Sequence, residues 1–507
     1  MRRTMEERRK EIRQGFRSSV PTPADKPSTA SRLTQTTCSS CDSTTKMECK
    51  VVQPWARTQD QVLTCKGWTL DNLLKMHKNF LAGDRVPVSK TTEEVIATFD
   101  AKGIPAVIEG LQHLPGWKDD LLNVDCLADD SSIEKVPVRN IHNNVDTKLS
   151  LLDFIERTRN ASPFVQPGES ERLYGKDLET PQSWIDWLHR GNVVPSCLLP
   201  TTDNLLVHLP ESAKVDTLMS YIGTGDTFTP SHKDLCASHG QNLMCYTEND
   251  GSSFWFMTRR QDARAVADYF HNKLEHDIDH ESYVTSVEDF ARAPFPVYVI
   301  EQKLGDLVIV PRTSCHQVVN HGGLTVKVSW SRMSLKSISQ AVYYELPLCR
   351  RVCRPETYRV RLTLYYTIRA LYTKFSEQHT VLSCSTDLRN QAQQITQALR
   401  IFDDVLQNEC VEDYVSLPCH LSSESNHLSC DFCGADIFQS FLECEECSSD
   451  GDPCTICPEC YAEGRSCSCQ LMQPTQVRPL NVILQERDEV IRGLQEHWKT
   501  SSEEGVE

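Results

Sequence analysis

Two histidines and an aspartate stand at positions that suit a mononuclear metal centre. His232-x-Asp234 places two side chains on one side of an extended segment, because side chains along a strand repeat every two residues. His316 follows on a second segment, which begins GDLVIVP. Two imidazoles and one carboxylate form the facial triad of non-haem Fe(II), which leaves coordination positions open for O₂ and a co-substrate. The competing interpretation of His316 is a hydrogen-bonded core histidine.

The elements that must position these residues are short β-strands. From about 204 to 332 the chain contains the runs LLVHLP, TLMSYIG, NLMCYT, SFWFMT, VYVIEQ, DLVIVP and TVKVSW, separated by Gly, Pro, Asp and Asn turns. Strands of that length and number predict a barrel or sandwich, interrupted by one helical insertion near 260–293. Helical periodicity returns over about 334–415.

Two fragments resemble the JmjC family of Fe(II)- and 2-oxoglutarate-dependent oxygenases. They are YIGTGDTFTPSHKDLCASHGQNLMCYT and EQKLGDLVIVPRTSCHQVVNHGGLTVKVSW. In matching order they supply Thr229, His232, Asp234, Gly305, Asp306, Pro311, His316, Gln317, Val318 and Asn320. The resemblance is specific over about 205–332 and implies a mainly β fold with helical additions, whose core is a double-stranded β-helix, or jelly roll.

The resemblance also implies roles for individual residues. His232, Asp234 and His316 would hold iron. Thr229 matches a hydroxyl that binds the distal carboxylate of the co-substrate 2-oxoglutarate, and Asn242 matches a side chain that helps to hold it. Tyr221 either faces the same site or is packed in the core.

The sequence departs from the family at one position. Many members place a lysine before the aromatic residue of the next strand, where this chain has Ser253. A buried dianion needs a cation nearby, because an unpaired carboxylate is costly to bury. Lys327 is the expected substitute, since it alternates with Val326 and Val328 along a strand. The alternative is that Lys327 points outward to solvent.

Nine of the 23 cysteines lie between Cys430 and Cys469. Eight of them form pairs that can close two tetrahedral zinc sites. These are Cys430/Cys433, Cys444/Cys447, Cys457/Cys460 and Cys467/Cys469. This segment resembles ZZ- or RING-like cross-braced zinc fingers. The resemblance implies that the first and third pairs bind one zinc ion and that the second and fourth pairs bind the other. Cys454 is left over and could compete as a ligand.

The amino-terminal region carries a weaker cysteine pattern. Cys38, Cys41, Cys49 and Cys65 could close a further zinc site or remain as reduced thiols. The basic run before them is either a nuclear-import signal or a solvated arm. The start MRRTMEERRKEIRQG has no apolar signal segment, so we expect metal-binding cysteines in a reducing compartment rather than disulfides.

These patterns predict a domain order along the chain. It comprises a basic tail and linker at 1–36, a JmjC-associated region at 37–200, the JmjC core at 201–335, a helical extension at 336–415, the zinc finger at 427–470 and a carboxy-terminal helix at 478–499. That last helix is expected either to cap the finger or to bind a partner.

Composition and charge restrict the classes of binding partner that we expect. The formal net charge is −17, and the chain has no apolar stretch of the roughly 18 residues that a membrane-spanning helix needs. The finger has Arg465 as its one cation among many acids, so we expect no direct sequence-specific binding of nucleic acid. We expect instead a histone tail or another methylated protein as substrate, and chromatin-associated proteins at the finger.

The resulting expectation is a nuclear histone lysine demethylase that hydroxylates N-methyl groups, with Fe(II), 2-oxoglutarate and Zn(II). Two alternatives stay open: a hydroxylase of a non-histone protein, and a catalytically silent JmjC scaffold that recruits partners through its finger. The intact triad favours an enzyme, and the missing lysine favours the scaffold.

Overall fold

The strand-like runs of the β-rich region pair into two sheets. The computed structural model describes residues 64–129, 135–379, 386–409, 417–419, 428–449 and 452–503. Within them, Thr36–Asn204 and Asp216–Met333 contribute to one compact unit, and Leu205–Val215 and Ser334–Glu507 contribute to a second.

The first unit contains a five-stranded sheet in the order β1-β11-β10-β13-β8 and a nine-stranded sheet in the order β2-β3-β12-β9-β14-β7-β6-β4-β5. Their bounds are β1 Phe80–Ala82, β2 Asp84–Pro87, β3 Ala106–Glu109, β4 Val136–Asn140, β5 Val145–Leu149, β6 Leu173–Glu179, β7 Met219–Gly223, β8 Phe228–His232, β9 His239–Thr247, β10 Ser252–Met257, β11 Val297–Gln302, β12 Leu307–Val310, β13 His316–His321 and β14 Thr325–Arg332. Apart from the parallel pairs β1/β11 and β2/β3, neighbouring strands are antiparallel.

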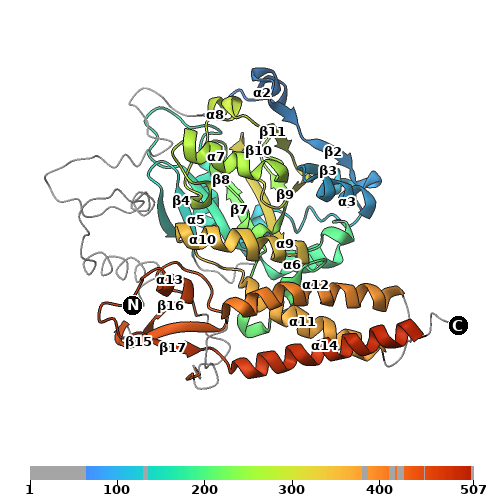
Figure 1. Cartoon of the computed structure of the whole chain (residues 1–507). Helices are drawn as coiled ribbons and strands as arrows, with labels where there is room; N and C mark the ends of the chain where they lie inside the picture. The colour runs from blue at the N-terminus through green and yellow to red at the C-terminus, as the bar shows by residue number, and fades with distance from the viewer. Residues whose placement is uncertain are drawn as a thin grey trace. The chain divides into compact units, whose positions relative to one another are not determined.

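The two sheets face each other across a buried layer. Trp255 and Ile300 from the five-stranded sheet meet Val308 and Val310 from the nine-stranded sheet in one apolar cluster. Alternation along each strand sends the intervening residues to the outer faces. This arrangement confirms the predicted jelly-roll core, and it leaves both outer faces to be covered by helices (Figure 1).

Helices cover both outer faces. Those of the first unit are α2 Leu70–Met76, α3 Glu93–Lys102, α4 Val124–Asp129, α5 Leu151–Asn160, α6 Gln182–Arg190, α7 Ala263–Lys273 and α8 Val287–Arg292. In α5, Ser150 caps the amino end, and Leu151, Phe154, Ile155 and Thr158 form a buried stripe at helical spacing. Helices α7 and α8 belong to the insertion predicted near 260–293, and they pack on the outer face of β10 and β11.

The second unit combines helices with a small sheet. Its elements are α9 Leu335–Gln340, a π-helix at Ala341–Glu345, α10 Leu346–Val352, α11 Val360–His379, α12 Thr386–Glu409, β15 Ser440–Ser449, β16 Asp452–Ile456, α13 Pro458–Ala462, β17 Gln473–Gln476 and α14 Leu480–Glu503. The strands pair in the order β16-β15-β17.

The carboxy-terminal helix α14 lies beside α11 and α12 (Figure 1). Arg487 Nε is 2.6 Å from Asp403 Oδ1 on α12. The ring of His497 lies 5.1 Å from that of Phe375 on α11. Gly493 allows α14 to approach closely, because a Cβ there would stand within contact of the Tyr372 side chain. The helix is therefore a third member of a helical layer.

Buried charges connect the cysteine-rich segment to the helical extension. Arg359 Nε donates to Asp436 Oδ1 at 3.0 Å, and the Asp436 main-chain N–H donates to Glu356 Oε2 at 3.2 Å. All three residues are buried. Burial and the neighbouring Asp436 charge raise the pKa of Glu356. Because leaving one partner of such a network unpaired is costly, the two segments are held as one folded unit.

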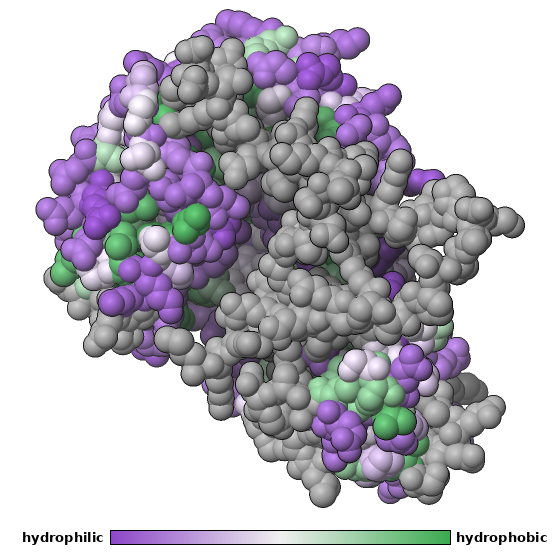
Figure 2. Space-filling model, turned by 90° about the vertical axis from the view of Figure 1, so that its left-hand side faces the viewer, coloured by the Kyte–Doolittle hydropathy of each residue, from purple (hydrophilic) through white to green (hydrophobic). Residues whose placement is uncertain are grey.

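No helix among the described residues is long and apolar enough to cross a membrane. Figure 2 shows one face of the molecule, on which the hydrophobic surface of the described residues forms small separate areas among hydrophilic ones.

Candidate metal and co-substrate site

The first two predicted ligands leave the end of β8. His232 is the last residue of the strand, and its Nδ1 donates a hydrogen bond to the Pro230 carbonyl at 2.8 Å. Asp234 follows at the start of a short turn, in which Cys236 and Ala237 have positive φ angles of 53° and 52°. Such angles are unfavourable for residues with a Cβ, so surrounding structure must hold this turn.

The third predicted ligand comes from the neighbouring strand. His316 opens β13 and lies directly opposite His232 in the antiparallel pairing. The two imidazole centroids are 4.0 Å apart, and His316 Nε2 is 3.8 Å from Asp234 Oδ1. One ligand atom from each of the three residues lies within 4.8 Å of the others. The structure therefore brings the predicted triad together.

The hydrogen bonds of both imidazoles suit metal binding. Like His232, His316 uses Nδ1 to donate to a main-chain carbonyl, that of Ser314, at 3.1 Å. A proton on Nδ1 leaves the Nε2 lone pair for a metal, and this second bond also orients the ring. Two Nε2 atoms and one carboxylate at this spacing fit the facial triad of Fe(II).

Gly240 on β9 makes room for the carboxylate. A Cβ at this position would stand 2.3 Å from Asp234 Oδ2 and 3.0 Å from Val310 Cβ. The absence of a side chain thus allows Asp234 to lie against the sheet. No motif in the sequence singles out this glycine.

Lys327 points into the interior between the sheets. Its side chain is 1% exposed, which excludes the outward orientation. Nζ donates to Asn320 Oδ1 at 2.6 Å and to Ser253 Oγ at 3.0 Å. Among the described residues it has no ion-pair partner, and burial lowers its pKa to about 7. Ser253 is the position where the family resemblance placed a lysine, so the ammonium reaches the same place from another strand.

Further hydroxyls and amides lie around this ammonium. Thr229 Oγ1 hydrogen-bonds the Tyr174 hydroxyl at 3.2 Å, and Asn320 Nδ2 donates to Thr227 Oγ1 at 2.8 Å. Tyr174 is fully buried, which raises its pKa and keeps it a neutral donor. Tyr174 lies on β6, far from the motif in sequence, and no pattern in its segment pointed to it.

Asn242 belongs to a second interior chain of hydrogen bonds. Trp255 Nε1 donates to Gln302 Oε1 at 2.9 Å, and Gln302 Nε2 donates to Asn242 Oδ1 at 3.1 Å. The Trp255 ring stacks on His316 with centroids 5.9 Å apart. These hydrogen bonds connect Asn242, the predicted co-substrate residue, to the surroundings of His316 through Gln302, which no sequence motif singles out.

Tyr221 is partly exposed, so it is not a fully buried core residue. It lies opposite Lys327 in the β7/β14 pairing, so both side chains leave the same face of the sheet. Its hydroxyl donates to Asp177 Oδ1 at 2.5 Å near the surface.

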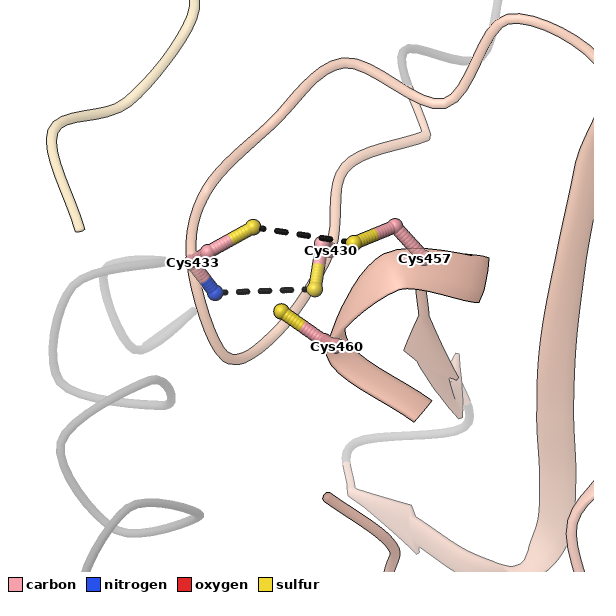
Figure 3. A group of neighbouring side chains, drawn as sticks. All are labelled: Cys430, Cys433, Cys457 and Cys460. Carbon is pink, nitrogen blue, oxygen red and sulfur yellow. Dashed lines mark hydrogen bonds between the residues drawn. The ribbon is translucent and has the colours of Figure 1, made fainter. Parts of the chain in front are cut away.

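The first cysteine cluster contains the first and third predicted pairs. Cys430, Cys433, Cys457 and Cys460 are buried, and their sulfur atoms all lie within 4.8 Å of one another. Figure 3 shows the four side chains converging from a loop and from α13. Hydrogen bonds from the three neighbouring thiols lower the pKa of Cys430. Four thiols around one point fit a tetrahedral zinc site.

The second cluster contains the other two pairs. Cys444, Cys447, Cys467 and Cys469 gather within the same limit, with Cys444 Sγ 3.3 Å from Cys469 Sγ. The cysteines therefore have the predicted cross-braced pairing. Cys454 belongs to neither group; it is buried opposite Cys444 in the β15/β16 hairpin.

Of the four amino-terminal cysteines, only Cys65 is described. Its buried thiol donates to the Asn320 carbonyl at 3.3 Å, and its main-chain N–H donates to Asp226 Oδ1 at 2.6 Å. The other members of that predicted zinc site, Cys38, Cys41 and Cys49, lie outside the described residues, as does the basic tail.

A jelly roll that brings two histidines and one carboxylate together at adjacent strand ends has the facial triad typical of non-haem Fe(II) oxygenases. Comparison with known families agrees: residues 219–331 match the "JmjC domain, hydroxylase" family. The chain thus contains a JmjC domain, as its motifs predicted, and residues of that domain fit Fe(II).

A curated relative extends the similarity beyond the domain. The chain is 29% identical over 422 residues to "C-module-binding factor A" of Dictyostelium discoideum, an alignment that covers 78% of this chain and 41% of the relative. The chain thus spans less than half the length of that relative.

Replacing Gly240 with alanine tests the space around Asp234. We expect Gly240→Ala to weaken Mn(II) or Fe(II) binding at least about tenfold, because the new Cβ displaces the carboxylate. Isothermal titration with Mn(II) measures the change. Met244→Leu, four residues along β9 from Gly240, is the control and should bind the metal normally. Unchanged affinity in Gly240→Ala would contradict the role given to Asp234.

The cysteine grouping predicts zinc content. We expect two zinc ions per chain by elemental analysis, one for each cluster. Cys460→Ser should remove one ion and lower the unfolding temperature, since metal binding supplies folding energy to so small a core. Cys454→Ser should keep both ions. Loss of zinc from Cys454→Ser would mean that the ligand sets are wrong.

Proposed function

We propose that this protein is an Fe(II)- and 2-oxoglutarate-dependent dioxygenase. The observation that carries the proposal is Lys327, a buried ammonium whose hydrogen-bond partners among the described residues are neutral, inside the same fold as the His232–Asp234–His316 triad. A buried cation without a counter-ion is costly. A dicarboxylate that chelates the metal and extends to Lys327 would remove that cost.

Each residue then has a defined task. The triad holds the metal on one face. Lys327 pairs with the distal carboxylate of 2-oxoglutarate, assisted by the hydroxyls of Thr229 and Tyr174, and Asn242 orients the co-substrate. Fe(II) bound there supplies the redox chemistry that couples O₂ and 2-oxoglutarate to hydroxylation of a substrate C–H bond, with release of succinate and CO₂.

For the substrate, we favour N-methyl groups of histone lysines, with the protein acting in the nucleus. Hydroxylation of an N-methyl carbon gives a hemiaminal, which collapses to formaldehyde and amine. The combination of a JmjC domain with an eight-cysteine cluster supports a role at chromatin, with the cluster as the docking module for chromatin proteins. A net charge of −17 is compatible with basic histone tails.

The test is a turnover assay on the full chain. Purified protein with Fe(II), ascorbate and labelled 2-oxoglutarate should release succinate, and methylated histone peptides should yield formaldehyde. Succinate with a hydroxylated product but no formaldehyde would indicate a protein hydroxylase instead. No turnover with any peptide, together with no thermal shift by N-oxalylglycine, would leave the catalytically silent scaffold.

Co-substrate binding should depend on Lys327. Lys327→Met should weaken the binding of N-oxalylglycine about 10- to 100-fold, the worth of a charge-assisted hydrogen bond. The exposed Lys336→Met is the matched control and should bind normally. An unchanged affinity in Lys327→Met would assign the carboxylate to another cation.

The pKa of Lys327 also predicts a pH dependence. Burial lowers this pKa to about 7, and only the ammonium form pairs with a carboxylate. The affinity for N-oxalylglycine should therefore be highest below pH 7 and fall as pH rises above it. Calorimetry across pH 6 to 9 measures the profile, and in Lys327→Met the decline above pH 7 should disappear.

A further inference from the structure

The strands that carry the two histidines pair irregularly beside them. His316 lies opposite His232, but the next residues do not match: Pro230 and Ser231 on β8 face the single residue Gln317 on β13. Two residues opposite one form a bulge, which interrupts the ladder. Pro230 also has no N–H to donate. The main-chain ladder alone therefore does not determine the spacing of the two imidazoles.

A segment of the helical insertion supplies the missing bonds. Gln317 Nε2 donates to the Thr285 carbonyl at 2.9 Å, and its Oε1 accepts from the Thr285 N–H at 2.8 Å. Ser231 Oγ donates to Gln317 Oε1 at 3.1 Å and lies 2.7 Å from Thr285 Oγ1. The Ser231 N–H donates to the Tyr283 carbonyl at 3.0 Å. We call Ser231, Thr285 and Gln317 the clasp; all three are at most 2% exposed.

The same insertion contacts the residue that lies between the first two ligands. Lys233, between His232 and Asp234, has its Nζ 2.9 Å from Asp279 Oδ1, and both side chains are buried. An ion pair in such surroundings resists displacement, because separating it leaves a buried charge unpaired. The turn that carries Asp234 is thus held from outside the jelly roll.

The beginning of the insertion holds the residues before His316. The Thr258 N–H donates to the Cys315 carbonyl at 2.9 Å, and Thr258 Oγ1 accepts from the Cys315 N–H at 3.0 Å. Ser314 Oγ donates to the Thr258 carbonyl at 2.7 Å. Ser314 is also the residue whose carbonyl accepts the Nδ1 proton of His316.

Apolar packing makes the insertion a firm support. Val266 and Phe270 of α7 and Phe290 of α8 are buried against Phe256 of β10 in one cluster. The rings of Phe256 and Phe290 stack with centroids 5.2 Å apart. The helices cannot move without opening this core, so the hydrogen bonds of the segment between them are held in place.

We infer that the helical insertion is the positioning element of the metal centre, and that the clasp sets the spacing between His232 and His316. This inference rests on one part of the proposed function, namely that the triad holds a metal. Gln317 and Thr285 are not among the candidate ligands. They are positioning residues, which act through the two strands that carry the ligands.

The test compares metal binding by the full chain and two variants. Gln317→Met removes the hydrogen bonds of the clasp at nearly constant volume. Tyr269→Phe is the matched control, because it removes a hydrogen bond within the insertion, from Tyr269 to the Asp289 carbonyl, that touches neither β8 nor β13. Mn(II) affinity is measured by calorimetry, and the ligand-field absorption of the Co(II)-loaded chain reports the coordination geometry.

We expect Gln317→Met to bind Mn(II) roughly 10- to 100-fold more weakly and to change the Co(II) spectrum, and Tyr269→Phe to resemble the wild type. If Gln317→Met does not fold, Thr285→Val, which removes only Oγ1, should show a smaller change of the same kind. An unchanged Co(II) spectrum and Mn(II) affinity, with only a lower unfolding temperature, would overturn the inference. Absence of Mn(II) binding in the wild type would instead refute the proposed function, and the inference with it.

Discussion

The pairing of β8 with β13 is the constraint on which the candidate centre depends. These strands are distant in sequence, and their contact places His316 opposite His232, with Asp234 just beyond the strand end. Each imidazole is oriented by a hydrogen bond from Nδ1 to a carbonyl two residues before it. The bulge in the β8/β13 pairing lies directly beside these two histidines. In a regular ladder, the alternation of side chains alone would determine their directions. The ligand set therefore lies where the strand pairing is irregular. Side-chain hydrogen bonds from the insertion hold the two strands together at this point.

The position of the buried cation shows how one electrostatic requirement can be met from different strands. Lys327 on β14 reaches Ser253 on β10, although the two strands belong to different sheets. Because the sheets face each other, a long side chain from one can reach the surface of the other. Serine and asparagine then serve as neutral partners, and no acidic side chain of the described residues pairs with the ammonium. The departure from the family motif is thus a relocation of the ammonium rather than its loss, and it favours the enzyme over the scaffold.

The cysteine-rich segment is part of a larger folded unit. Its two groups of four cysteines gather around separate points, while Asp436 and its partners connect the segment to the start of α11. A finger this small has little core of its own, so bound zinc together with the helix contacts would account for its order. The boundaries predicted for the finger and for the helical extension stay predictions, because the structure joins both segments in one compact unit.

The sequence by itself determined the features that are local in the chain. The HxD pair, the later histidine and the spacing of the cysteine pairs were readable because ligand chemistry restricts residue type and spacing, and strand alternation indicated that Lys327 could face inward. The tertiary structure alone decided which distant groups meet. Four such contacts carry no sequence motif, because hydrogen bonding and close packing constrain them only after the chain has folded. They are Tyr174 with Thr229, Gln302 with Trp255 and Asn242, Gly240 with Asp234, and Thr285 with Gln317. Such contacts depend on the strand register and on how the two sheets face each other. Many sequences can form the same sheets with different residues at these contacts.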